Sequence, residues 1–202
     1  LHRLIRRQRQ MCIRDSLGGE RGFALEKPCY EVIRRVYEAN GVECTELAMG
    51  EDGIISSELS GCAAGVLHVT PFNSYPSHVT APASKRHEYA RWARAHGAYI
   101  VEDDYDSEFS SVTRQIDTIY SLVPERVIYV NTFSKTLAPA IRTAYMVLPE
   151  ELMAEYTRRL GFYSCTVPAF EQYVLAEFIN GGELERYINR RRRILRQEKK
   201  EK

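Results

Sequence analysis

Short apolar runs of strand character alternate with segments of helical spacing along most of this chain of 202 residues. In the helical segment 30–39, Val32, Ile33, Val36 and Tyr37 recur at the spacing that places side chains on one face of a helix. The runs of strand character are residues 22–25, 42–49, 65–70, 98–101, 126–130 and 142–148. Because strands that alternate with helices pair mainly in parallel, this order predicts an α/β fold with a largely parallel sheet.

Residues that begin or end helices bound the other helical segments. Ser84 is a good N-cap for a helix that Gly97 would end, and Pro149 suits the start of another. Two more helices are expected at residues 169–179 and 184–197. The side chains that share one face of the helix before Gly97 are Tyr89, Trp92, Ala93 and His96, a stripe that predicts core packing.

Three polar loops directly follow apolar runs, at residues 70–82, 102–109 and 131–142. In open parallel sheets, ligands bind in the crevice beyond the carboxyl ends of the strands. These three loops are therefore the predicted location of a binding site.

The loop 131–142 contains one lysine among hydroxyl side chains, followed by an arginine. Lys135 stands beside Ser134 and close to Thr132, and Arg142 follows seven positions later. A lysine can form an imine, while hydroxyl groups and a guanidinium are good partners for phosphate. From these residues alone, a solvated loop lysine with a salt-bridged arginine remains an equal alternative.

The loop 102–109 carries a cluster of acidic residues after a buried strand. Asp103 and Tyr105 are two positions apart, so on an extended backbone their side chains point the same way. A carboxylate can hold a pyridine nitrogen protonated, and a phenol can bond the ring's hydroxyl oxygen. Asp104 and Asp106 would then face elsewhere and pair with arginines. A metal site is the alternative, but no second cluster of ligands supports one.

Together, residues 102–109 (E-D-D-Y-D-S-E-F) and 131–145 resemble the active-site signature of fold-type I pyridoxal-phosphate (PLP) enzymes. More narrowly, the first segment is similar to the aminotransferase-like domain of MocR/GabR-type regulators, a branch of the GntR superfamily. The similarity runs in register from about residue 22 to residue 196. It implies a three-layer sandwich with a mostly parallel sheet, the large domain of the PLP transferases, truncated at both ends.

The resemblance also implies a role for each matching residue. Lys135 would be the catalytic residue that forms the Schiff base with PLP, and Asp103, with Asp104 as the fallback, would pair with the pyridine nitrogen. Tyr105 would bond the phenolic oxygen of PLP. Phosphate would be bound by Thr132, Ser134 and Arg142. No metal is expected.

Two further segments match the family, and one position departs from it. Tyr75-Pro76-Ser77 resembles a turn beside the cofactor, and residues 26–30 (E-K-P-C-Y) resemble a segment whose aromatic lies near the substrate entrance. His78 stands where the family usually has glycine. If that position needs a positive φ, histidine costs ~1 kcal/mol there. The phosphate-binding helix and the ring-stacking aromatic expected upstream have no match in residues 1–21.

Charge is concentrated at the two ends of the chain. Residues 1–16 contain five arginines and one acid, and residues 186–202 contain nine basic residues and two acids, so the body between them is acidic. Basic ends are compatible with nucleic-acid contact, but a charged helix face is the preferred interpretation of the C-terminal run. Residues 11–16 resemble translated sequencing adaptor; a natural disordered arm is the alternative.

Cysteine usage and hydropathy favour a reduced, cytoplasmic location. The five cysteines are widely scattered and form no C-x-x-C pair. No apolar run approaches the ~20 residues that a membrane-spanning helix needs.

These observations predict three parts and leave three functions open. Residues 1–16 are a non-native or disordered arm, 17–181 a partial PLP-binding large domain, and 182–202 a helix leading toward a missing small domain. The preferred function is the effector-sensing domain of a MocR-type transcriptional regulator, homodimeric when whole, which binds a small amino compound and contacts DNA only through an upstream domain. The alternatives are a catalytic class I/II aminotransferase acting on an amino acid and a non-functional truncated fragment.

Overall fold

The computed structural model describes residues 13–14, 17, 22–105, 107–109, 117–163, 165 and 167–198. Its centre is a six-stranded sheet in the order β2-β1-β3-β4-β5-β6. The strands are β1 (Phe23–Lys27), β2 (Cys44–Ala48), β3 (Val66–Val69), β4 (Tyr99–Asp104), β5 (Val127–Thr132) and β6 (Ala144–Val147). All neighbours pair in parallel except β6, which runs antiparallel to β5. The predicted α/β fold with a mostly parallel sheet is confirmed.

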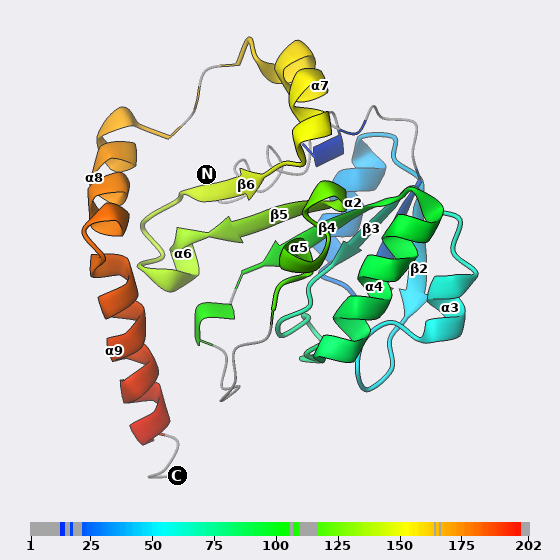
Figure 1. The fold of residues 1–202 in the computed structure, drawn as a ribbon, viewed down its shortest axis with the longest axis horizontal. Helices are drawn as coiled ribbons and strands as arrows, with labels where there is room; N and C mark the ends of the chain where they lie inside the picture. The colour runs from blue at the N-terminus through cyan, green and yellow to red at the C-terminus, as the bar shows by residue number, and fades with distance from the viewer. Residues whose placement is uncertain are drawn as a thin grey trace.

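Helices cover both faces of the sheet and give it three layers (Figure 1). One face packs against α3 (Ser56–Ser60), α4 (Ala83–His96) and α5 (Ile119–Leu122), and its core includes Leu59 and Tyr89. The other face packs against α2 (Glu31–Ala39) and α7 (Glu150–Leu160), where Tyr37 and Leu152 are buried. The two apolar clusters need strands with side chains on both faces, so the central strands are almost entirely buried.

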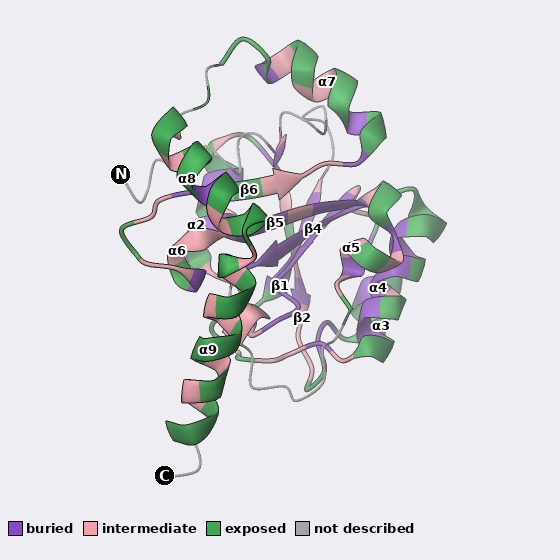
Figure 2. Cartoon of the chain, turned by 60° about the vertical axis from the view of Figure 1, so that its left-hand side comes forward, coloured by how far each residue is buried: buried purple, intermediate pink, exposed green. Residues whose placement is uncertain are grey.

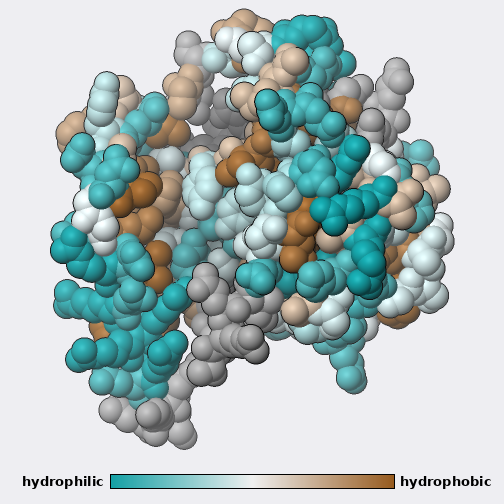
Figure 3. Space-filling view, viewed as in Figure 1, coloured by the Kyte–Doolittle hydropathy of each residue, from teal (hydrophilic) through white to brown (hydrophobic). Residues whose placement is uncertain are grey.

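The last two helices extend away from this body. The helices α8 (Ala169–Asn180) and α9 (Glu183–Glu198) are largely exposed (Figure 2). Figure 3 shows apolar side chains on α8 and a hydrophilic surface on α9. Hydrogen bonds between described residues connect α9 to the body: Arg192 Nε donates to the Glu108 carbonyl (2.5 Å) and Tyr187 Oη to the Leu137 carbonyl (3.3 Å).

The start of α4 differs from the sequence-based expectation. The helix begins at Ala83, and its N-cap is Pro82 rather than Ser84. Pro82 has φ −69°, which suits a helix start, and its carbonyl accepts the first helical bond from Arg86 N. The predicted end is correct, because Gly97 adopts the left-handed conformation with φ 58°.

The acidic cluster also lies elsewhere than expected. Strand β4 continues to Asp104, so Glu102, Asp103 and Asp104 are buried strand residues and not loop residues. Glu102 accepts hydrogen bonds from the backbone amides of Ile119 (2.9 Å) and Tyr120 (2.8 Å). Burial raises the pKa of Glu102 to about 7. Asp104 likewise accepts from the hydroxyls of Ser107 and Tyr129, so donors from other segments compensate the burial of Glu102 and Asp104.

Three smaller observations concern the chain ends, the thiols and hydropathy. Ile13 and Leu17 are buried in the same cluster as Phe23, while most of the expected arm 1–16 lies outside the described residues. Cys29, Cys44, Cys62 and Cys165 are free thiols, and Cys12 lies outside the described part. Among the described residues, no helix has the length and apolar character needed to cross a membrane.

Candidate functional site

The three loops predicted to form a site do meet at one edge of the sheet. The strands β3, β4 and β5 are parallel, so the residues that follow each of them emerge on the same side. Strand β6 starts at this edge because it is antiparallel, and its Ala144 pairs with Thr132. Arg142, two residues before Ala144, therefore lies next to the turn that follows β5.

Lys135 stands on a short helical turn, α6 (Phe133–Thr136), directly after β5. Thr132 caps this turn, because its Oγ1 accepts a hydrogen bond from the Ser134 amide at 3.2 Å. The lysine side chain is exposed, and its Nζ lies 5.5 Å from the centre of the Tyr105 ring. An ammonium group over a ring face is an attractive arrangement, so the end of β4 and the start of α6 are held together.

Tyr105 joins the end of β4 to the loop that follows β3. Its hydroxyl donates to the carbonyl oxygen of Asn73 at 2.7 Å, and Asn73 Nδ2 lies 3.4 Å from the same hydroxyl. Three chain segments far apart in sequence thus meet at Tyr105, through Asn73, Tyr105 and Lys135.

Asp103 lies on the face of the sheet that packs against α2. It is 5% exposed, and its Oδ2 is 3.8 Å from Nε2 of His68 on β3. The Nδ1 atom of His68 is 2.8 Å from the hydroxyl of Tyr37 on α2. No motif in the sequence marks His68; the available signal is a histidine inside an otherwise apolar strand.

Asp104 points to the opposite face and has different partners. Its Oδ2 accepts from the hydroxyls of Ser107 (2.7 Å) and Tyr129 (2.7 Å), so the expected pairing with an arginine is wrong. Burial raises the pKa of Asp104 and, together with the Asp104 charge, that of Tyr129. Asn131 extends this network by donating to the carboxylate of Glu108 at 2.9 Å. Asp106 lies outside the described residues.

The three predicted phosphate partners converge on the turn between β5 and β6. Thr132 Oγ1 lies 3.3 Å from the Thr143 carbonyl, Ser134 Oγ donates to the Ile141 carbonyl at 2.5 Å, and Arg142 Nη1 donates to the Pro139 carbonyl at 3.3 Å. Their polar groups therefore also shape the turn itself, a use that the residue types alone did not indicate.

Tyr75 belongs to an aromatic group at the same edge. It is 51% exposed, and its ring lies 5.8 Å from the Tyr30 ring and 6.1 Å from the His78 ring. His78 has φ 58°, the conformation that would favour glycine. Its Nδ1 lies 2.9 Å from Asn73 Oδ1, a contact that glycine could not make.

A buried carboxyl group binds the loop that follows β3. Glu26, at the end of β1, accepts a hydrogen bond from Ser74 Oγ at 2.7 Å. Burial raises the pKa of Glu26 to about 7, and the nearby Asp103 charge adds to the increase.

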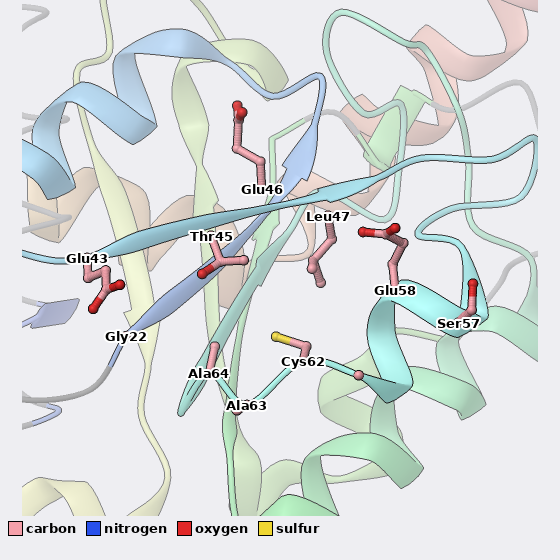
Figure 4. Close-up of a pocket in the computed structure, with 11 residues that line it drawn as sticks. Gly22, Glu43, Thr45, Glu46, Leu47, Ser57, Glu58, Cys62, Ala63 and Ala64 are labelled. Carbon is pink, nitrogen blue, oxygen red and sulfur yellow. The ribbon is translucent and has the colours of Figure 1, made fainter.

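Two surface grooves lie away from this edge. A groove of about 620 Å³ runs along the outer strand β2, where Leu47, Glu58 and Cys62 contribute to its lining (Figure 4). A second, of about 800 Å³, lies between α5 and α7 and includes Tyr120 and Met153. Neither of these two grooves includes Lys135, Tyr105 or Asp103, so the polar edge is described by its converging side chains.

Comparison with known proteins identifies the family. The model of the family "Aminotransferase class I and II" matches residues 9–201. The chain belongs to this family.

The curated relatives of this aminotransferase-family chain include transcriptional regulators. It is 34% identical over 187 residues to the uncharacterized HTH-type transcriptional regulator YhdI of Bacillus subtilis. This alignment covers 92% of the chain and 39% of YhdI. The chain is 28% identical over 177 residues to the probable rhizopine catabolism regulatory protein MocR of Rhizobium meliloti, covering 87% of the chain and 36% of MocR. The chain thus spans about two fifths of the length of these relatives.

Solved structures support the fold. The α-aminoadipate aminotransferase LysN of Thermus thermophilus, complexed with N-(5'-phosphopyridoxyl)-L-leucine, matches with a TM-score of 0.80 and 24% identity. The match covers 95% of the chain and 51% of LysN. The six-stranded sheet is therefore that of the large domain of PLP-dependent aminotransferases.

Proposed function

We propose that this chain is a PLP-binding, aminotransferase-like domain that senses an amino compound as part of a MocR-type transcriptional regulator. The observation that carries the proposal is the convergence of Lys135, Tyr105 and Asp103 from neighbouring strands at the carboxyl edge of the sheet. The family, the related regulators and the structural neighbour LysN, which is complexed with a phosphopyridoxyl derivative of leucine, support the same proposal.

The chemistry of the donor set fits PLP. Lys135 offers an exposed amine on a capped turn, and Tyr105 presents its ring to that amine. Asp103 offers a buried carboxylate for the ring nitrogen, whereas Asp104 on the other face is engaged by Ser107 and Tyr129. When bound, PLP supplies an electron sink for charge at the carbon next to an amino group.

In this proposal each residue of the chain has a defined task. Lys135 binds the cofactor covalently through Nζ, and Tyr105 directs its hydroxyl to the cofactor's phenolic oxygen. Thr132, Ser134 and Arg142 bind the phosphate, which requires the turn between β5 and β6 to exchange some of its carbonyl partners for phosphate oxygens. Tyr75 binds the cofactor from the turn beside it, and Tyr30, whose ring lies 5.8 Å from that of Tyr75, borders the entrance used by the amino compound.

The similarity to regulators favours sensing over turnover. A sensor binds an amino compound and shifts a conformational equilibrium, and it needs no release of product. A regulator would place DNA binding in another domain of a cytoplasmic homodimer. We further assign residues 17–181 to the cofactor-binding domain and 182–202 to a helix that leads to a second domain.

A catalytic class I/II aminotransferase is the second candidate, supported by the solved neighbours, which are enzymes. There Lys135 would also move a proton as general base. Incubation with PLP and a panel of amino acids, followed by assay for the oxo acids, separates the two: turnover above the Lys135→Ala background favours the enzyme.

The first experiment is an absorbance titration of the 202-residue chain with PLP, followed by borohydride reduction and peptide mapping. We expect a visible-range band and, after reduction, an adduct on Lys135. Lys135→Ala should abolish both, whereas Lys27→Ala, an exposed lysine at the end of β1, should change neither. A folded chain that gives no band, or an adduct on another lysine, would contradict the proposal.

A further inference from the structure

A buried histidine faces the carboxylate assigned to the cofactor's ring nitrogen. His68 is 4% exposed on β3 and Asp103 is 5% exposed on β4, with 3.8 Å between Nε2 and Oδ2. Within the described part of the chain, Nε2 of His68 has no hydrogen-bond partner. This separation is longer than a hydrogen bond. Nε2 of His68 therefore lies near the Asp103 carboxylate, and no other described group forms a hydrogen bond with it.

The contact between Tyr37 and Nδ1 of His68 favours one tautomer of the histidine ring. The Tyr37 hydroxyl lies 2.8 Å from Nδ1, and Tyr37 itself is 1% exposed. When the phenol donates to Nδ1, the neutral imidazole carries its hydrogen on Nε2. The opposite arrangement would turn a nitrogen lone pair toward a carboxylate oxygen, which is repulsive. In the favoured arrangement, the Tyr37 hydroxyl donates to Nδ1 of His68, and the Nε2–H of His68 points to the Asp103 carboxylate.

Packing alone does not explain a histidine at this position. The neighbours of His68 in the sheet are Leu25 on β1 and Val101 on β4, both buried and apolar. An unsatisfied buried polar group costs about 1–3 kcal/mol, so an apolar side chain would suit the strand better. The histidine is compatible with this environment because Tyr37 and Asp103 lie on either side of its ring.

Glu26, a second acid near Asp103, does not compete for this contact. Burial, with a smaller contribution from the Asp103 charge, raises the pKa of Glu26 to about 7, and Ser74 occupies Glu26 Oε2. Near neutral pH Glu26 is therefore partly protonated and adds less negative charge beside Asp103 than an ordinary carboxylate would.

We propose that His68 is a positioning residue for Asp103: its Nε2–H, fixed by Tyr37, holds the carboxylate in the orientation that binds the ring nitrogen of the cofactor. This inference rests on the proposed function, since it takes Asp103 as the ring-nitrogen partner. It adds Tyr37 on α2 and His68 on β3 to the residues of the proposed site.

Four variants of the 202-residue chain test this role. His68→Leu removes the Nε2–H, His68→Gln keeps an N–H donor near its place, and Tyr37→Phe removes only the bond to Nδ1. Val101→Ala is the matched control, because it creates a cavity beside His68 and changes no polar group. The measurements are PLP affinity, the position of the visible band of the bound cofactor, and unfolding of the cofactor-free chain.

We expect His68→Leu to weaken PLP binding by about tenfold, comparable to the loss of metal affinity when the hydrogen-bond partner of a metal ligand is removed, and to shift the visible band. His68→Gln should restore most of the affinity. Val101→Ala should lower stability yet leave affinity within about twofold. If His68→Leu binds PLP like the wild type with an unchanged band, or if Val101→Ala is equally impaired, the inference is wrong.

Nitrogen-resolved NMR of the histidine rings separates this inference from the proposed function, because it needs no cofactor. The hydrogen of the neutral His68 ring should be on Nε2, and Asp103→Asn should shift the Nε2 resonance more than that of Nδ1. A hydrogen on Nδ1 would overturn the inference whether or not PLP binds. Absence of a Lys135 adduct in the wild type, with the hydrogen on Nε2, would reject the proposed function and leave the His68–Asp103 pairing supported.

Discussion

The amine of Lys135 and the ring of Tyr105 meet across two neighbouring strands, with Nζ 5.5 Å from the ring centre. Lys135 follows β5 and Tyr105 follows β4, so their proximity depends on the parallel pairing of these strands. Tyr105 is held in turn by the Asn73 carbonyl. The position of the Tyr105 ring next to Lys135 therefore depends on the loop after β3, and this dependence can be tested directly.

Replacement of Tyr105 by phenylalanine should loosen this link without changing the ring. Loss of the 2.7 Å bond to the Asn73 carbonyl should lower the free energy of unfolding by about 1 kcal/mol. PLP affinity should also fall, because the hydroxyl assigned to the cofactor is gone. Urea denaturation and PLP titration measure the two effects, with Tyr163→Phe at an exposed site as the control. Unchanged affinity in Tyr105→Phe would remove this residue from the proposed site.

Arg86 should be the residue on which the loop after β3 depends most. It is fully buried, donates to the carbonyls of Ala81 (2.9 Å), Pro71 (2.9 Å) and Asp117 (3.0 Å), and lies over the Phe72 ring. Arg86→Met should destabilise the fold by roughly 3–5 kcal/mol, because these carbonyls and Glu102 lose their cation.

The matched control for Arg86 is Arg94→Met on the same helix. Arg94 is exposed and pairs with Glu125 at 3.0 Å, so its replacement should cost less than about 1 kcal/mol. Equal midpoints of chemical denaturation for the two variants would show that Arg86 does not anchor the loop.

The contrast between these residues explains what the sequence could reveal. The strands, the long helices and the order of Asp103, Tyr105 and Lys135 are local patterns, and they were predicted. The role of Arg86 depends on carbonyls up to 31 residues away, and that of His68 on Tyr37, also 31 residues away. No periodicity encodes such contacts.

The acidic loop was expected to start at Glu102, whereas β4 continues to Asp104. This error also arises from contacts between residues far apart in the sequence. A run of acids is typical of a solvated loop, but Glu102 is stabilised in the sheet by amides of α5, 17 and 18 residues later. Asp104 is likewise stabilised by Tyr129, 25 residues later. These donors come from segments that only the folded chain brings close, so burial of the acids could not be read from their own positions.

The strained position of His78 gives a prediction on backbone conformation. Its φ of 58° is unfavourable for any residue with a Cβ atom. His78→Gly and His78→Ala both lose the contact with Asn73, so their difference isolates the strain. Thermal or urea unfolding should show the glycine variant to be more stable than the alanine variant by about 1 kcal/mol. Equal stabilities would mean that the turn adopts another conformation in solution.

Glu26 should make the stability of the chain depend on pH. Burial raises its pKa from 4.5 to about 7, so the folded state binds a proton more tightly than the unfolded state. The folded state then holds more protons between these two values, and its free energy of unfolding falls as pH rises from about 4.5 to about 7. Over this window the loss from Glu26 alone should be about 3 kcal/mol.

Glu26→Gln should remove that part of the pH dependence while keeping an acceptor for Ser74 Oγ. Relative to the wild type, the variant should gain stability as pH rises, and the gain should level off above about pH 7. Part of the slope should remain, because burial also raises the pKa of Glu102 to about 7. Urea denaturation at a series of pH values measures the slopes, and Glu58→Gln, at an exposed position, should leave the wild-type slope intact. A Glu26→Gln variant with the full wild-type slope would show that this carboxyl group takes up no proton on folding.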